Sequence, residues 1–321
     1  MKSVSELTDF YYKVLYPTLK KLEKDRKHLR YRILLVGSGY TFVFFLIATT
    51  LGKNLNFGAD FLAFVFFVYF GIGAFVYKFL IKDYTDEFKN KIIEPLIQEL
   101  DNRLNYTQLL HVPQHLFERS EFFKQTVDRL RGNDYVHGEI DGVRLEFSDL
   151  HAEKRHKDSK GRESWSTIFQ GLFIVADFHK TFHGKTVILP DSAQSTFGDL
   201  IGGWLQSKNL ERDELIKLDN NEFEKKFVVY GTDQIEARYI LSHSLMHKLL
   251  GFEKKSKHPL YISFVGHSIH IGIEYNKDLF EPSVFSSLLE YKIAMEYVQT
   301  LHLAIGIVEE LKLNQKLWSK R

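Results

Sequence analysis

Two histidines, His243 and His247, have a spacing that could support metal chemistry. They lie four residues apart in a segment patterned as a helix, so both rings project from one face and could bind one divalent transition-metal ion. Ser244 stands where a zincin has its general-base glutamate, so the His-Glu-x-x-His motif is absent. A membrane-tethered metal-dependent enzyme is therefore the alternative interpretation, and exposed or hydrogen-bonded histidines are the simpler one.

Other candidate motifs lack residues that their chemistry needs. Gly198 to Gly203 is rich in glycine, but it has neither the Gly-Lys-Ser/Thr ending of a P-loop nor the spacing of a dinucleotide fingerprint. His267 and His270 bracket a tight turn, and their odd spacing points them to opposite faces of a regular strand. The chain has no cysteine and no Gly-x-Ser-x-Gly elbow. We therefore expect no cofactor and a protein that is not an enzyme.

The helix that positions the histidine pair is predicted over Asp233 to Leu250. Asp233 is the expected N-cap, and Glu236 would complete a capping box. Arg238 leaves the first turn on another face, free to pair with a carboxylate. A binding role for Glu236, Arg238 and Tyr239 is a hypothesis beside the structural interpretation, which is a rigid junction between strand and helix.

Two apolar runs, Ile33 to Leu51 and Phe61 to Ile81, dominate the first third of the chain. Each has the length of a helix that crosses a hydrocarbon core, and the first contains no ionisable side chain. We predict a transmembrane hairpin; the alternative is two core helices of a soluble protein. Small residues on the runs would allow close helix approach or self-association: Gly37, Gly39, Gly71, Gly73 and Ala74.

Basic residues beside the runs predict the orientation of the hairpin. Lys53 is the one basic residue in the connecting loop, whereas a basic cluster precedes the first run: Lys20, Lys21, Lys24, Arg26, Lys27, Arg30 and Arg32. By the positive-inside rule, both termini and the remainder of the chain are cytoplasmic in a multi-pass protein of the inner membrane. We expect the cluster to face lipid. The net charge of +2 is no nucleic-acid footprint.

The expected fold class is α+β: a helical hairpin with amphipathic stalk helices, then a cytoplasmic domain of mostly antiparallel sheet with a long C-terminal helix. Apolar stripes on the flanking helices should pair: Leu7, Phe10, Tyr11, Val14 and Leu22 with Phe88, Ile92, Leu96, Leu100 and Leu104. The predicted divisions are an amphipathic basic helix over 1–32, the transmembrane hairpin over 33–81, a stalk helix over 82–115 and a cytoplasmic domain over 116–321, with a further division into 116–205 and 214–321.

Within the cytoplasmic domain, alternating runs predict hairpins separated by helices. The Asp141-Gly142 dipeptide marks a tight hairpin, and the charged stretch His151 to Glu163 is expected as an exposed loop or hairpin tip. The other expected elements are helices over 117–131, 233–250 and 282–313, and strands over 166–177, 185–189, 215–218, 223–230, 261–265 and 269–274.

Several stretches carry a resemblance to a known family. They are Tyr135 to Phe147 with Gly138 and Gly142, Phe169 to Phe178, Phe223 to Asp233, and Glu236 to Leu241. Together with the hairpin they resemble a bacterial family known only as domain of unknown function 3137. The resemblance implies a membrane-anchored cytoplasmic domain, and it brings no activity, cofactor or catalytic residue.

The sequence therefore favours a non-enzymatic docking or scaffold domain held at the membrane. The expected partners are the lipid bilayer and either a protein of unknown identity or further copies of this chain, as in an oligomeric membrane assembly. Nucleic acid is not expected as a partner.

Overall fold

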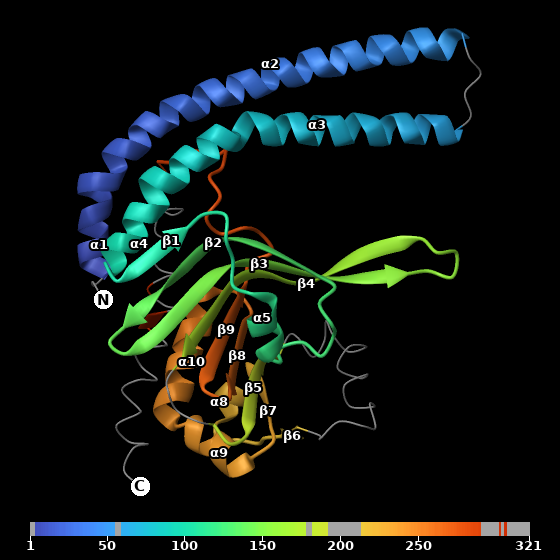
Figure 1. The fold of residues 1–321 in the computed structure, drawn as a ribbon. Helices are drawn as coiled ribbons and strands as arrows, with labels where there is room; N and C mark the ends of the chain where they lie inside the picture. Colours follow the sequence, from blue (N-terminus) through green and yellow to red (C-terminus); the bar gives the residue numbers. More distant parts are fainter. Residues whose placement is uncertain are drawn as a thin grey trace. The chain divides into compact units, whose positions relative to one another are not determined.

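The computed structural model describes residues 4–54, 59–177, 182–191 and 213–289, together with 302, 305 and 306. The chain forms two compact units (Figure 1). The helical unit comprises Ser5–Leu96 and Glu281–Met295, and the sheet unit comprises Ile97–Phe280 with Met1–Val4 and Glu296–Arg321. The predicted α+β fold class, with long apolar helices preceding a mostly antiparallel sheet, is confirmed.

The helical unit consists of two antiparallel helical arms. One arm contains α1 (Val4–Phe10), the π-helical turn η1 (Tyr11–Leu15) and α2 (Tyr16–Asn54); the other contains α3 (Ala59–Phe88), the π-helical turn η2 (Lys89–Ile93) and the start of α4 (Glu94–Leu100). Each π-helical turn lies just before a proline, Pro17 or Pro95. Proline lacks the N–H that an α-helix needs at that point, and the wider turn accommodates this while the helix continues.

Most residues of the predicted apolar stripes are buried, and those up to Leu96 lie in the helical unit, whereas Phe10 is half-buried. Leu7, Leu22, Phe88 and Leu96 are each 3% exposed or less. Val14 departs from the prediction because it lies 48% exposed. Further leucines extend the stripe along the first arm: Leu15, Leu19 and Leu29.

Two helices of this unit are long and apolar enough to cross a membrane, by length and composition. No residue in the apolar window of either helix is buried. A core helix of a soluble protein buries most of such a window, and neither helix does so. Side chains such as Phe42, Phe67 and Phe75 are 69%, 78% and 73% exposed.

The two apolar helices touch through aromatic rings rather than through glycines. The Tyr40 ring stacks on the Tyr69 ring with centroids 4.9 Å apart, and the Tyr40 hydroxyl donates to the Tyr69 carbonyl at 2.9 Å. A Cβ on Gly73 would lie 3.7 Å from the Tyr40 ring, but one on Gly37, Gly39 or Gly71 would meet nothing within 4 Å. These three glycines therefore do not mediate the approach of the two helices.

The sheet unit is built on one nine-stranded antiparallel sheet, in the order β1-β2-β3-β4-β9-β8-β5-β7-β6 (Figure 1). It includes strands from both 116–205 and 214–321. The strands are β1 (Leu104–Thr107), β2 (Arg129–Ile140), β3 (Val143–Lys157), β4 (Glu163–Asp177), β5 (Lys185–Pro190), β6 (Glu214–Leu215), β7 (Phe227–Gly231), β8 (Leu260–Val265) and β9 (Ser268–Glu274).

An aromatic core lies between the sheet and the short helix α5 (Gln114–Arg119). The Phe117 ring of α5 contacts Phe169 and Phe173 of β4, with centroids 5.6 and 5.1 Å apart. The predicted Asp-Gly hairpin is confirmed, since Asp141 and Gly142 have φ of 51° and 82° and Ile140 pairs with Val143.

Several predicted helix and strand boundaries are wrong. The helix predicted over 117–131 is only α5, because Glu121 takes a φ of 55° that no helix continues through, and β2 begins at Arg129. The helix predicted over 233–250 is two helices, α9 (Gln234–Ile240) and α10 (His243–Ser256), and Ser242 between them caps α10 through Leu245 N. The strand predicted over 223–230 begins as the helix α8 (Asn221–Glu224).

Two predicted long helices also have wrong boundaries. The helix expected over 82–115 ends at Leu100, where Asp101 opens a turn that leads into β1. The expected terminal helix does not begin at Pro282, since residues 281–289 are irregular. Most of its remaining length lies outside the described residues.

Candidate functional site

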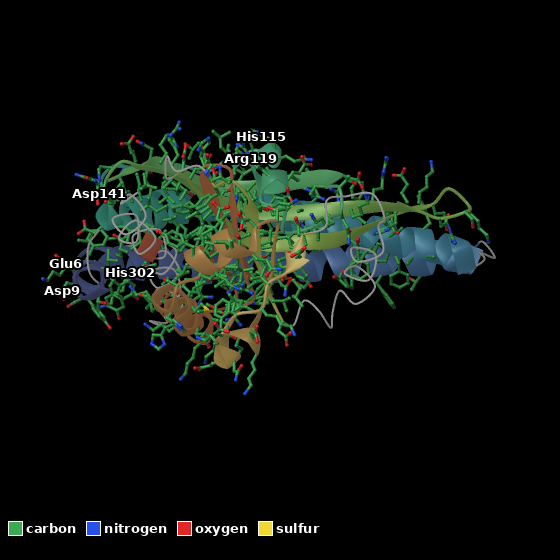
Figure 2. All side chains as sticks on the ribbon, turned by 90° about the horizontal axis from the view of Figure 1, so that it is seen from below. Glu6, Asp9, His115, Arg119, Asp141 and His302 are labelled. Carbon is green, nitrogen blue, oxygen red and sulfur yellow. The ribbon has the colours of Figure 1, made fainter. Side chains whose placement is uncertain are left out.

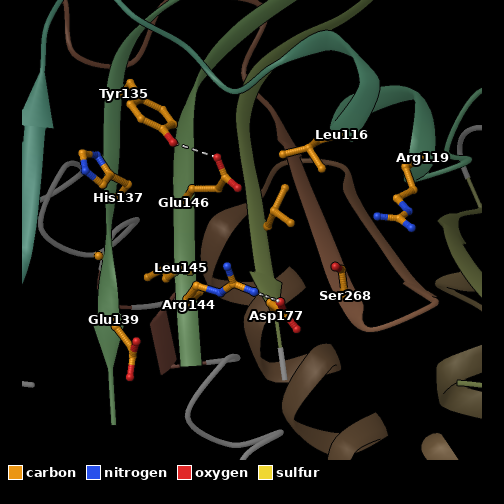
Figure 3. Close-up of a pocket in the computed structure, with 12 residues that line it drawn as sticks. Leu116, Arg119, Tyr135, His137, Glu139, Arg144, Leu145, Glu146, Asp177 and Ser268 are labelled. Carbon is orange, nitrogen blue, oxygen red and sulfur yellow. Dashed lines mark hydrogen bonds and ion pairs between the residues drawn. The ribbon is translucent and has the colours of Figure 1, made fainter. Parts of the chain in front are cut away.

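A groove of about 440 Å³ lies on one face of the sheet unit (Figure 3). Its floor is formed by β2, β3, β4 and β9, and Leu116 and Arg119 of α5 form one wall. Alternate residues of each strand face the groove, so the antiparallel register arranges their side chains in rows across the strands.

The first row runs through Glu139, Arg144, Asp177 and Ser268, which are direct register neighbours. Arg144 Nη2 donates to Asp177 Oδ2 at 2.8 Å. This pair neutralises the two charges in the middle of the row, as Figure 3 shows.

The second row runs through His137, Glu146, Val175 and His270. The hydroxyl of Tyr135 donates to Glu146 Oε2 at 2.8 Å, and the Tyr135 ring stacks on His137 at 5.2 Å. Burial, and then the negative Glu146, raise the pKa of Tyr135 to about 12. The tyrosine therefore stays protonated at neutral pH.

His270 is fully buried on the same face, with its ring stacked on Phe173. Its Nδ1 lies 3.2 Å from Ser263 Oγ, and its Nε2 has no hydrogen-bond partner among the described residues. Burial, and then the positive charge of Arg119, lower the pKa of His270 to about 3. The imidazole is therefore neutral at physiological pH.

The two ends of the groove carry exposed charges of opposite sign. Arg119 projects from the surface of α5 beside His115 (Figure 2), and Glu139 lies exposed on β2. Neither forms an ion pair with any residue that the structure describes. Arg119 lies near the turn before β9, because a Cβ on Gly266 would be 4.0 Å from its Nη2. Three inter-strand spacings, about 14 Å, separate β9 from β2, which carries Glu139. The groove is therefore positive at one end and negative at the other, and between them lie the Arg144–Asp177 ion pair and the carboxylate of Glu146, which accepts from Tyr135.

The predicted pair His243 and His247 lies in the first turns of α10. No group of three or more His, Cys, Asp or Glu side chains in the described ranges is arranged to hold a metal ion. The structure thus brings no third ligand to this pair, and the pair lies apart from the groove's lining.

The junction at the start of α9 differs in part from its prediction. Asp233 is the N-cap, and its Oδ1 accepts from Ile235 N and Glu236 N. Glu236 does not close a capping box: its carboxylate accepts from His183 N at 3.1 Å and from Gly184 N at 2.7 Å. Arg238 donates to the Lys217 carbonyl rather than to a carboxylate. The exposed Tyr239 keeps its binding role as a prediction.

Because Glu236 fixes two backbone N–H groups, we expect Glu236→Ala to destabilise the sheet unit by about 2 kcal/mol. Glu236→Gln keeps one carbonyl oxygen as an acceptor and should lose about half as much. Urea unfolding of the full chain in detergent measures both. Equal stability of Glu236→Ala and the wild type would show that the contact is not a structural clamp.

The prediction of the lipid-facing basic cluster is wrong for one residue, Arg26. Six of the basic residues are exposed: Lys20, Lys21, Lys24, Lys27, Arg30 and Arg32. Arg26 is 4% exposed, because its Nε and Nη2 donate to Glu23 at 2.8 and 2.7 Å and its Nη1 donates to the Val284 carbonyl at 2.6 Å. Arg26 therefore belongs to an internal ion pair of the helical unit and not to a lipid-facing surface.

Sequence reasoning did not find Arg119 and Glu139. Arg119 lies in the segment 117–131, which the sequence predicts as a longer helix, and Glu139 lies just before the predicted Asp141-Gly142 turn. The available signal was the alternation of Tyr135, His137 and Glu139 along β2, which places three functional groups on one face.

Comparisons with known proteins give two findings. No curated protein matches this chain. A solved structure, "crystal structure of the mycobacterial trehalose monomycolate transport factor A, TtfA", has 9% sequence identity and a TM-score of 0.30, over 64% of this chain and 90% of that chain. A likeness at this level carries no argument about fold or function.

The model of a protein family described as "Protein of unknown function (DUF3137)" matches residues 167–313. The matched range contains three of the stretches on which the resemblance rests: Phe169 to Phe178, Phe223 to Asp233 and Glu236 to Leu241. The predicted resemblance is confirmed over residues 167–313, which match the model of the DUF3137 family of proteins of unknown function.

Proposed function

We propose that this protein is a non-enzymatic docking protein, anchored in the cytoplasmic membrane by a helical hairpin, whose sheet unit lies in the cytoplasm. The exposure of both apolar windows supports the anchor, because so much apolar surface needs lipid around it. Exposed basic residues precede the first apolar helix, and this supports a cytoplasmic position of both termini.

The charge pattern of the groove supports docking rather than catalysis. A general acid or base works best with a pKa near the operating pH. Burial moves the pKa of His270 to about 3 and that of Tyr135 to about 12. Of the other central charges, Arg144 and Asp177 form an ion pair, and Glu146 accepts a hydrogen bond from Tyr135. The groups inside the groove therefore fit a structural role better than acid–base catalysis.

The single observation that carries the proposal is the pair of uncompensated charges at the two ends of the groove. Arg119, near the start of β9, and Glu139, on β2, would bind groups of opposite sign separated by about 14 Å across the strands. An extended polypeptide rises about 3.3 Å per residue, so an acidic and a basic side chain roughly four residues apart span this distance. The partner we expect is a protein segment of this kind.

Site-specific photo-crosslinking in membranes tests this proposal. A photoreactive residue is placed at His137, within the groove, and as a control at Lys254, an exposed position on α10. We expect a discrete crosslinked partner from position 137 and none from position 254. The yield of this product should fall at least about tenfold when Arg119→Glu is added, because a negative charge at position 119 would then face the acidic side chain of the partner. Identical products from both positions, or products that persist with Arg119→Glu, would contradict docking in the groove.

A further inference from the structure

The hairpin of β3 and β4 extends well beyond the sheet to which it belongs (Figure 1). The pairing of β2 with β3 ends at Arg129 and Glu153, and the pairing of β9 with β4 ends at Gly171. From Lys154 to Ser166 the two strands pair only with each other, and nearly every residue is exposed. This segment, the outer ribbon, contributes no core to the fold.

The tip of the outer ribbon is locally ordered. Asp158 Oδ1 accepts from Lys160 N at 2.9 Å and from Arg162 N at 2.8 Å, and Asp158 Oδ2 accepts from Arg162 Nε at 2.8 Å. A two-stranded ribbon exposed on both faces is marginally stable in water. The turn presents Lys160 at the far end of such a ribbon, an arrangement that serves an interaction better than packing.

The charged residues of the outer ribbon are predominantly basic. Residues 154–166 contain five Lys and Arg against two acidic residues. Both carboxylates are already neutralised, Asp158 by Arg162 and Glu163 by Arg155. Lys157 and Lys160 have no ion pair with a described residue. The ribbon therefore offers uncompensated positive charge to an anionic partner.

An amphipathic aromatic side chain lies on the same ribbon. Trp165 pairs across the ribbon with Arg155 and is 40% exposed. The Arg129 guanidinium lies over the indole ring, 3.9 Å from its centroid, and this contact fixes the ring while the exposed part faces solvent. Tryptophan beside lysines is typical of protein surfaces at the membrane–water interface.

We infer that the outer ribbon, through Lys157, Lys160 and Trp165, binds the anionic headgroups of a lipid bilayer. The inference rests on the proposed membrane anchoring, since a chain tethered by its own apolar helices always has headgroups at hand. The combination of free lysines and an exposed indole favours a lipid surface over a nucleic acid, which would be expected to use a larger basic footprint.

The test uses the full chain in lipid nanodiscs. Trp204→Phe and Trp318→Phe leave Trp165 as the one tryptophan of the chain's three. With phosphatidylglycerol in the nanodisc, we expect the fluorescence emission of Trp165 to shift to shorter wavelength and to be quenched by brominated acyl chains. In phosphatidylcholine alone, or at high salt, both effects should be lost.

Matched variants separate this contact from a general charge effect. Lys157→Glu with Lys160→Glu should abolish the blue shift, because each lysine removed weakens the attraction to the anionic bilayer about fivefold. Lys254→Glu with Lys255→Glu changes the same charge on α10 and should leave the shift intact. A Trp165 spectrum that is the same in both lipids, or a shift that survives the ribbon variant, would overturn the inference.

The two proposals fail differently in this experiment. A chain that stays in the aqueous phase and does not enter nanodiscs contradicts the membrane anchor itself. A chain that enters nanodiscs while Trp165 ignores the lipid charge overturns only the ribbon's role.

Discussion

Replacing Arg26 by leucine is expected to destabilise the helical unit by about 3–5 kcal/mol, because Glu23 would remain buried without a counter-ion. The two side chains are 5% and 7% exposed, and Arg26 Nη2 lies 2.7 Å from Glu23 Oε1. The pair also binds the segment after Glu281: Arg26 donates to the Val284 carbonyl, and Glu23 accepts from Leu288 N. Thermal unfolding in detergent, with hydrogen exchange at residues 283–288, measures the loss.

Two controls make this prediction specific. Lys27→Leu changes a neighbouring exposed lysine and should shift stability by less than about 0.5 kcal/mol. The double replacement Glu23→Leu with Arg26→Leu removes both charges and should recover more than half of the loss. If Arg26→Leu is as mild as Lys27→Leu, the pair does not hold the segment.

The same pair predicts an acid dependence. The hydrogen bonds from Arg26 lower the pKa of Glu23 below its usual value of 4.5. A lowered folded-state pKa gives stability that is complete above pH 4.5 and is lost as the pH falls through the folded-state pKa. Glu23→Gln should therefore flatten the acid limb of the stability curve.

Two substitutions of Asp149, by asparagine and by alanine, are expected to change the stability of the sheet unit in opposite directions. It is completely buried in the sheet unit, near Asp134 and Asp278, and its Oδ2 accepts from Leu279 N at 2.6 Å and Phe280 N at 3.3 Å. Burial, and then Asp134, raise the pKa of Asp149 well above its usual value of 3.8. Asp149→Asn keeps an acceptor without the cost of burying a carboxylate, so it should stabilise at pH 7.

Asp149→Ala leaves two backbone N–H groups without an acceptor and should destabilise by about 2–4 kcal/mol. The raised pKa means that wild-type stability falls as the pH rises above 3.8, by about 1.4 kcal/mol per pH unit up to the folded-state pKa. The advantage of Asp149→Asn should therefore grow with pH and vanish in acid. Urea unfolding from pH 3 to 8 measures this, and an asparagine variant as unstable as the alanine variant would contradict it.

Much of the fold follows from local signals in the sequence. The apolar runs, the Asp141-Gly142 turn and the Asp233 cap each act through neighbouring residues, and the structure confirms all three. The break between α9 and α10 is less visible, although Ser242 is a good N-cap residue placed where the second helix begins.

The positions that sequence reasoning missed depend on contacts between distant residues. Glu236 binds the backbone of residues 183 and 184, and no local pattern shows this contact. The groove requires the register of four strands before Glu139 and Arg119 can be recognised as its two ends. Arg26 is the exception: it lies four residues after Leu22 and three before Leu29, on the buried stripe, and that spacing indicates an internal charge.

The central claim, a membrane hairpin with the sheet unit in the cytoplasm, is tested most directly by cysteine accessibility. The chain contains no cysteine, so single cysteines can be introduced at Asn54, beside the loop, and at Ser159, at the tip of the outer ribbon. In spheroplasts, a membrane-impermeant maleimide should label Asn54→Cys, and it should label Ser159→Cys only after lysis. Labelling of Ser159→Cys in intact spheroplasts, or protection of Asn54→Cys, would contradict the account.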